Sequence, residues 1–183
     1  MKNVKILATV ILATLSLASC SDDDDLPEVI NEEEVITTMT ITLVPDNDGA
    51  SVILKTQDLD GDGPDEPVVT SGKLVAGVTY DGSIELLNEL ETPAEDITLE
   101  VIEEDLDHQI FYTIASDLGV TIDNVNLDSE GNLLGTEFKL TAGAASSGLL
   151  TFTLRHEPTK PNTGLEDAGG ETDIEVSFNV EVE

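Results

Sequence analysis

Carboxylate side chains recur at alternate positions in one short stretch of the sequence. Asp58, Asp60 and Asp62 are each separated by a single residue, a glycine follows as Gly63, and Glu66 stands shortly after it. Carboxylate oxygens are the ligands that Ca²⁺ prefers, and this spacing allows a tight loop to wrap several of them around one ion. The stretch is therefore a candidate calcium loop, and an empty acidic turn is the alternative.

The pattern departs from an EF-hand, because Val69 occupies the place of the bidentate glutamate and strands are expected on both sides. It is similar to the calcium loops of FG-GAP-type β-hairpins. That resemblance implies Asp58, Asp60 and Asp62 as side-chain ligands, while Glu66 stands where the motif has aspartate. The sequence carries a single copy, so the propeller that FG-GAP repeats build is not implied. A bound calcium is expected to clamp a loop.

The two histidines of the chain form the second candidate site. His108 and His156 each follow the apolar phase of a predicted strand, so they are expected to meet near one edge of the fold. Imidazole nitrogens joined by acidic oxygens suit Zn²⁺ or Cu²⁺, and Glu103, Asp107 and Glu157 are their acidic neighbours in the sequence. The alternative is a pair of packing or hydrogen-bonding histidines at strand ends.

The elements that must position these residues are mostly strands. A period of two in apolar residues predicts a hairpin over residues 36–57 and further strands at 74–86, 110–114, 120–125, 137–140, 149–156 and 174–182. Gly82 interrupts its strand and suggests a bulge. Thr92, Pro93 and Glu95 predict the start of one helix, over residues 93–104. The fold expected for residues 35–183 is a single all-β domain, an immunoglobulin- or fibronectin-like antiparallel β-sandwich with at most one short helix.

The segment before this domain has the features of a bacterial lipoprotein leader. Two lysines precede an apolar run over residues 6–17, and the small residues of the sequence LASC lead to Cys20, the one cysteine of the chain. We expect residues 1–19 to be a signal peptide and Cys20 to carry acyl chains such as palmitate, which anchor the protein in a membrane. Residues 20–34 then form an acidic tether. Their acidic run resembles the signal by which some Bacteroidota lipoproteins reach the outer face of the outer membrane.

Composition narrows the function classes. The chain has 39 acidic and 7 basic residues, a net charge of −32, and this field repels the phosphates of nucleic acid and favours cations as partners. Aromatic residues make up only 3%, which disfavours a sugar-binding surface. The sequence has no Gly-x-Ser-x-Gly, phosphate-binding glycine loop or His-Glu-x-x-His, so we expect a protein that is not an enzyme.

Five segments resemble a group of small Bacteroidota lipoproteins often catalogued as "type 1 periplasmic binding fold superfamily". They are residues 21–25 (SDDDD), 58–64 (DLDGDGP), 92–98 (TPAEDIT), 154–158 (LRHEP) and 169–174 (GGETDI). The residues predict a lipid-anchored, non-enzymatic binding or accessory module, in cation or nutrient uptake, and the resemblance of its acidic run to the export signal implies the cell surface of the outer membrane as its location. Its expected partners are the membrane, through Cys20, and an outer-membrane protein. The alternative function is a purely structural surface module with a calcium-clamped loop.

Overall fold

Buried and exposed side chains alternate along most of the chain that the structure describes, residues 34–61 and 65–183. Alternation of this kind belongs to strands, because successive side chains of an extended backbone point to opposite faces. In the computed structural model the elements are β1 (Thr38–Pro45), β2 (Val52–Gln57), β3 (Val68–Ser71), β4 (Lys73–Leu74), β5 (Thr79–Asn88), β6 (Glu95–Asp96), α1 (Ile97–Glu103), β7 (His108–Ile114), β8 (Val120–Asp123), β9 (Glu137–Ala142), β10 (Ser146–His156), α2 (Leu165–Ala168) and β11 (Glu171–Val182). The predicted signal peptide, Cys20 and the tether up to residue 33 lie outside the described residues.

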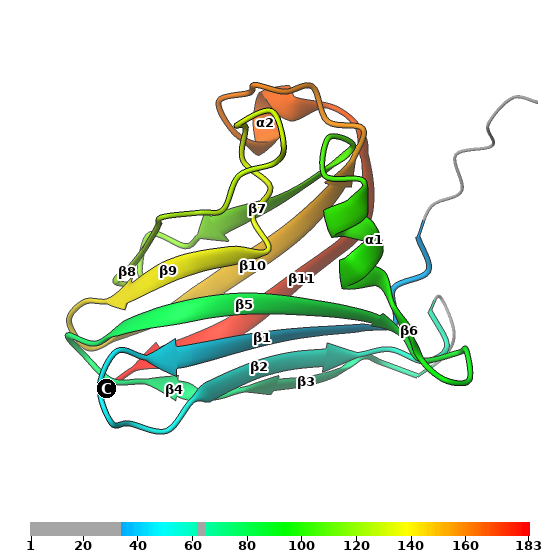
Figure 1. The fold of residues 1–183 in the computed structure, drawn as a ribbon. Helices are drawn as coiled ribbons and strands as arrows, with labels where there is room; N and C mark the ends of the chain where they lie inside the picture. Colours follow the sequence, from blue (N-terminus) through cyan, green and yellow to red (C-terminus); the bar gives the residue numbers. More distant parts are fainter. Residues whose placement is uncertain (1–33, 62–64) are drawn as a thin grey trace, which may run out of the picture. The chain divides into compact units, whose positions relative to one another are not determined.

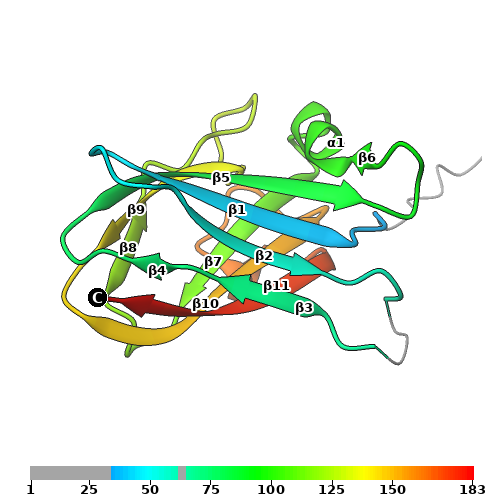
Figure 2. The same ribbon diagram turned by 90° about the horizontal axis from the view of Figure 1, so that it is seen from below.

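The strands form two sheets (Figures 1 and 2). One has the order β3-β2-β1-β5-β9-β8, with β6 added beside β5, and the other has the order β4-β11-β10-β7. Neighbouring strands are antiparallel, except that β4 runs parallel to β11. The structure thus confirms the predicted all-β sandwich. It adds a second short helix, α2, that the sequence analysis did not anticipate.

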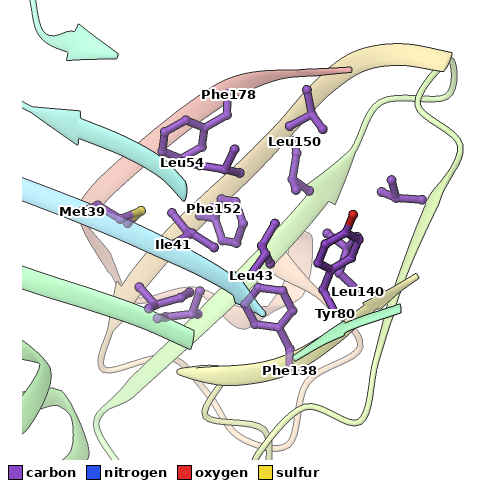
Figure 3. Packing of buried hydrophobic residues seen from close by; sticks show 14 of the residues in the cluster. Met39, Ile41, Leu43, Leu54, Tyr80, Phe138, Leu140, Leu150, Phe152 and Phe178 are labelled. Atoms are coloured by element: carbon purple, nitrogen blue, oxygen red, sulfur yellow. The ribbon is translucent and has the colours of Figure 1, made fainter. Parts of the chain in front are cut away.

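The inner faces of the two sheets meet in an apolar core (Figure 3). Met39, Ile41 and Leu54 come from the first sheet and are completely buried. Phe152, from the second sheet, lies with its ring centroid 5.9 Å from that of Phe178 and 6.1 Å from that of Phe138. Burial of each large apolar side chain contributes about 1.5–3 kcal/mol. Because the chain has a single cysteine, this core stabilises the domain without an internal disulfide.

The predicted hairpin over residues 36–57 is confirmed, but the predicted bulge at Gly82 is wrong. β1 and β2 pair continuously from Thr38 opposite Gln57 onwards. Gly82 has a regular partner on each side, Leu43 in β1 and Phe138 in β9. The glycine is required by packing, since a Cβ atom there would lie 2.4 Å from Cζ of Phe138.

The predicted helix exists, but it begins later than the sequence pattern suggested. α1 starts at Ile97, and the side chain of Asp96 caps it by accepting a hydrogen bond from the backbone N–H of Thr98 at 3.1 Å. The residues before it pair with β5 as β6, so Thr92 is not the N-cap. Ile97 and Val101, one helical turn apart, are the buried residues of α1.

Several elements gather where β7 begins and β10 ends (Figure 1). α1 leads directly into β7, and α2 lies in the connection between β10 and β11. The segment that leads into β1 approaches the same end, because Glu34 lies beside His108. Among the described residues, no helix is long and apolar enough to cross a membrane.

Candidate metal centre

The two histidines lie opposite each other on adjacent strands. His108 is the first residue of β7 and His156 the last residue of β10, and the antiparallel register pairs them directly. Their rings are stacked, with centroids 4.6 Å apart and planes inclined by 26°. Both residues are buried, with 0% and 5% of their surface exposed. The prediction that the two histidines meet at one edge of the fold is therefore confirmed.

Backbone contacts determine which nitrogen of His108 is available. Its Nδ1 lies 3.1 Å from the backbone carbonyl oxygen of Glu104. A carbonyl oxygen can only accept a hydrogen bond, so Nδ1 carries the hydrogen and, in the neutral ring, Nε2 keeps its lone pair. This arrangement, in which one ring nitrogen donates to a carbonyl while the other is directed at a site, is the usual one for a metal-binding histidine.

The lone pair of His108 faces a buried carboxylate. Nε2 lies 3.3 Å from Oε1 of Glu34, whose side chain is only 7% exposed. Within the described part of the chain, neither Nε2 of His108 nor Oε2 of Glu34 has a hydrogen-bond partner. A lone pair and a carboxylate oxygen repel at this distance unless a proton or a cation lies between them. The pair is therefore suited to bind a positive charge.

His156 supplies a third donor to the same place. The ligand atoms of Glu34, His108 and His156 all lie within 4.8 Å of one another. Bonds of about 2.0–2.2 Å to a tetrahedral Zn²⁺ place two ligand atoms about 3.4 Å apart. The separation of 3.3 Å between His108 and Glu34 already matches this value. The remaining separations are at most 4.8 Å, and the side chains would have to rotate for all three donors to contact one ion.

Asp173 and Gly170 also lie close to His156. Nδ1 of His156 lies 3.8 Å from Oδ1 of Asp173, whose side chain is completely buried. The carboxylate adds a negative charge beside the ring of His156. Gly170 has a φ of +72°, and a Cβ atom there would lie 2.2 Å from the backbone oxygen of His156. Glycine is thus required for the close approach of this backbone.

Two further carboxylates surround Glu34 on its solvent side. Glu100 and Glu104, from α1 and its C-cap, form a second group with Glu34 whose ligand atoms lie within 4.8 Å of one another. Burial raises the pKa of Glu100, and the negative charges of Glu34 and Glu104 raise it further. Like charges held this close favour the binding of a cation, which would relieve their repulsion.

A buried lysine fixes the backbone beneath the histidines. Nζ of Lys160 donates hydrogen bonds to the backbone oxygens of His108 and Asp105, each at 2.6 Å, and to Oδ2 of Asp128 at 3.0 Å. Burial alone would raise the pKa of Asp128, but the hydrogen bonds from Lys160 and from the backbone of Asn132 outweigh it, and the pKa is lowered. Asp128 therefore remains ionised and keeps Lys160 against the start of β7.

The acidic partner of the histidines is not one that the sequence suggested. Glu103, Asp107 and Glu157 are exposed, and none of them belongs to the group that contains both histidines. Glu34 takes that place, although the sequence assigned it to the end of the tether. It stands in an acidic run with little apolar content, so no local pattern distinguishes it from its neighbours. Only the path of the chain beside α1 reveals it.

The structure describes only part of the candidate calcium loop. Asp58, Asp60 and Glu66 line one surface hollow of about 210 Å³, while Asp62 lies outside the described residues. Oδ1 of Asp58 accepts hydrogen bonds from the backbone N–H groups of Asp60 at 3.3 Å and Gly61 at 3.0 Å. Oδ2 of Asp60 accepts one from the backbone of Asp65 at 3.2 Å. The carboxylates of Asp58 and Asp60 thus accept hydrogen bonds from the described backbone of the loop, and calcium binding stays a prediction.

Comparison of the chain with protein-family models, with curated proteins and with solved structures gave no match. The resemblance to small Bacteroidota lipoproteins therefore stays a prediction.

Proposed function

We propose that this chain is an envelope lipoprotein whose β-sandwich is a non-enzymatic accessory module that binds a divalent transition-metal cation. The observation that carries the proposal is the buried group of Glu34, His108 and His156. Within it, a lone-pair nitrogen faces a carboxylate oxygen at 3.3 Å without a hydrogen bond. Two imidazoles and one carboxylate are a ligand set suited to Zn²⁺ or Cu²⁺.

A cation satisfies this site better than a proton does. Protonation of His108 would place an imidazolium against the stacked ring of His156, with centroids 4.6 Å apart, and would leave Oε2 of Glu34 without a partner. A bound cation would engage both imidazoles and the carboxylate together. The net charge of −32 adds a favourable long-range field.

Burial of the three side chains supports binding rather than catalysis. The side chains of His108 and Glu34 are 0% and 7% exposed, and that of His156 is 7% exposed. A catalytic metal needs an open coordination position that a substrate can reach. A closed group favours a structural or stored cation. The predicted lipoprotein leader, residues 1–19 before Cys20, supports an envelope location, and we propose the membrane and an outer-membrane protein as partners.

Equilibrium dialysis of the metal-stripped protein against Zn²⁺, Cu²⁺ and Ca²⁺ tests the proposal. We expect one Zn²⁺ or Cu²⁺ per chain, lost in the double variant His108→Ala/His156→Ala. Glu103→Gln is the matched control, because Glu103 is an exposed acid at the same end of the molecule and lies outside the group. Stoichiometric binding that survives in the double variant would overturn the proposal.

The calcium loop supports a second candidate function, that of a structural surface module. The observation in its favour is that Asp58, Asp60 and Glu66 line the same hollow. Calcium binding in the same dialysis that is lost on Asp60→Ala, without zinc or copper binding, would favour this alternative. The two sites use different residues, so their outcomes are independent.

A further inference from the structure

We infer that the metal site is also a clasp: a cation held by Glu34, His108 and His156 fastens the segment leading into β1 to the sheet of β7 and β10. The inference rests on the proposed metal binding and names a consequence of it. Binding of a cation would then determine how firmly the segment that precedes β1 is attached to the domain.

Two ligands come from one sheet, and the third comes from the segment that leads into the other sheet. His108 and His156 belong to adjacent strands of the β4-β11-β10-β7 sheet. Glu34 shortly precedes β1, which lies near the middle of the other sheet. In Figure 1 the blue segment that leads into β1 comes in beside α1, at this end of the sheets. A shared cation would therefore connect the two sheets at this end.

Backbone hydrogen bonds hold the entering segment only from Thr37 onwards. The N–H of Thr37 donates to the carbonyl oxygen of Leu87 at 3.0 Å, and its own carbonyl accepts from Asp58 at 2.7 Å. Within the described residues, no backbone hydrogen bond of this kind involves Glu34, Val35 or Ile36. Ile36 packs against the hydrophobic core, and the side chain of Glu34 is the other described contact that attaches these residues.

The contacts of Glu34 are unfavourable without a cation. Its buried carboxylate faces the lone pair of His108 at 3.3 Å, and Oε2 has no hydrogen-bond partner among the described residues. The carboxylates of Glu100 and Glu104 stand on its other side. These groups all repel the charge of Glu34, whereas a divalent cation attracts it. The attached state is thus the one that a cation stabilises, which is the condition for a ligand to shift a conformational equilibrium.

The clasp gives metal binding a mechanical consequence. Glu34 lies at the boundary between the predicted tether and the domain. If Cys20 is acylated as proposed, the anchored segment and the sandwich are joined through this residue. Cation binding would fix the direction in which the chain enters the domain, and cation loss would release it. Cation binding would act on the entering segment through Glu34, and the strands of the two sheets would keep their places.

Hydrogen–deuterium exchange on the whole chain, with and without Zn²⁺, tests the clasp. We expect saturating Zn²⁺ to slow exchange of the Thr37 N–H by about tenfold or more in the wild-type protein, because its hydrogen bond to Leu87 must open before exchange. Glu34→Gln should abolish this slowing and weaken zinc binding at least about tenfold. Glu103→Gln should behave as the wild type.

The outcomes separate the clasp from the metal site. Zinc binding without slower exchange of the Thr37 N–H, or equal slowing in Glu34→Gln, overturns the clasp and leaves the proposed function intact. No zinc binding by the wild-type chain overturns both. The comparison of the wild-type protein with and without Zn²⁺ needs no variant, so it holds even if a substitution impairs folding.

Discussion

His108 and His156 occupy directly paired positions on β7 and β10, and their rings stack with centroids 4.6 Å apart. The pair lies at the end of the apolar core, where the strands would otherwise present aliphatic side chains. Nε2 of His108 faces the carboxylate of Glu34 at 3.3 Å, and this contact is the basis of the proposed cation site.

Zinc should stabilise the protein against heat. Free Zn²⁺ at about one hundred times its dissociation constant adds about 2.7 kcal/mol to the native state. For a chain of this size that corresponds to a rise in Tm of about 5–10 °C. His156→Ala should remove the rise, which differential scanning calorimetry at fixed protein concentration measures.

The control for this prediction is Asp107→Asn. Asp107 is an exposed acid next to His108 in the sequence and lies outside the group of ligands. It should retain the full zinc-dependent rise in Tm. An undiminished rise in His156→Ala would show that zinc stabilises the protein from another site.

The sandwich could be predicted from the sequence because apolar and polar residues alternate clearly along its strands. Along β11, for example, Phe178, Val180 and Val182 are buried and the residues between them are exposed. The pairing of His108 with His156 followed from the same alternation. The role of Glu34 could not be predicted, because its burial depends on contacts with β7 and α1, which are distant in sequence. The start of α1 was misplaced for a local reason, since Asp96 competes with Thr92 as the N-cap.

Because of the ion pair between Asp128 and Lys160, part of the free energy of unfolding should depend on pH. The pKa of Asp128 is lowered in the folded state, so its contribution is complete above the unfolded value near about 3.9 and is lost as the pH falls through the folded value. Asp128→Asn should reduce the free energy of unfolding at pH 7 by about 2 kcal/mol, because Lys160 loses its buried counter-charge.

Urea unfolding at pH 7, 5 and 3 checks this prediction. The difference between the wild type and Asp128→Asn should be largest at pH 7 and should shrink below about pH 4. Asp48→Asn is the control for general charge effects, since Asp48 is an exposed acid in the turn between β1 and β2. A difference that stays constant with pH would mean that the ionised carboxylate of Asp128 contributes nothing.

Gly170→Ala should lower the free energy of unfolding and weaken metal binding. Its positive φ of +72° is strained for alanine, and the new Cβ would lie 2.2 Å from the backbone oxygen of His156. We expect a loss of about 3 kcal/mol, from strain and from displacement of the backbone. The displacement should also weaken zinc binding, because His156 is a ligand in the proposed site.

Gly77→Ala separates the two effects. Gly77 has a similar φ of +77°, but a Cβ atom there would meet nothing within 4 Å. It should cost only about 1 kcal/mol and leave zinc affinity unchanged. Equal losses of stability in the two variants, measured by urea unfolding, would contradict the proposed contact between Gly170 and His156.

Gly82→Ala should be destabilising although Gly82 has a regular place in β5. The added Cβ would lie 2.4 Å from Cζ of Phe138, and the ring cannot move away because it packs against Tyr112 and Phe152, with centroids at 5.0 and 6.1 Å. Overpacking of this kind costs about 2 kcal/mol. The smaller side chain in Phe138→Leu should relieve the clash, so the double variant Gly82→Ala/Phe138→Leu should be more stable than the sum of the single losses predicts. A double-mutant cycle with additive free energies of unfolding would show that the two residues do not interact.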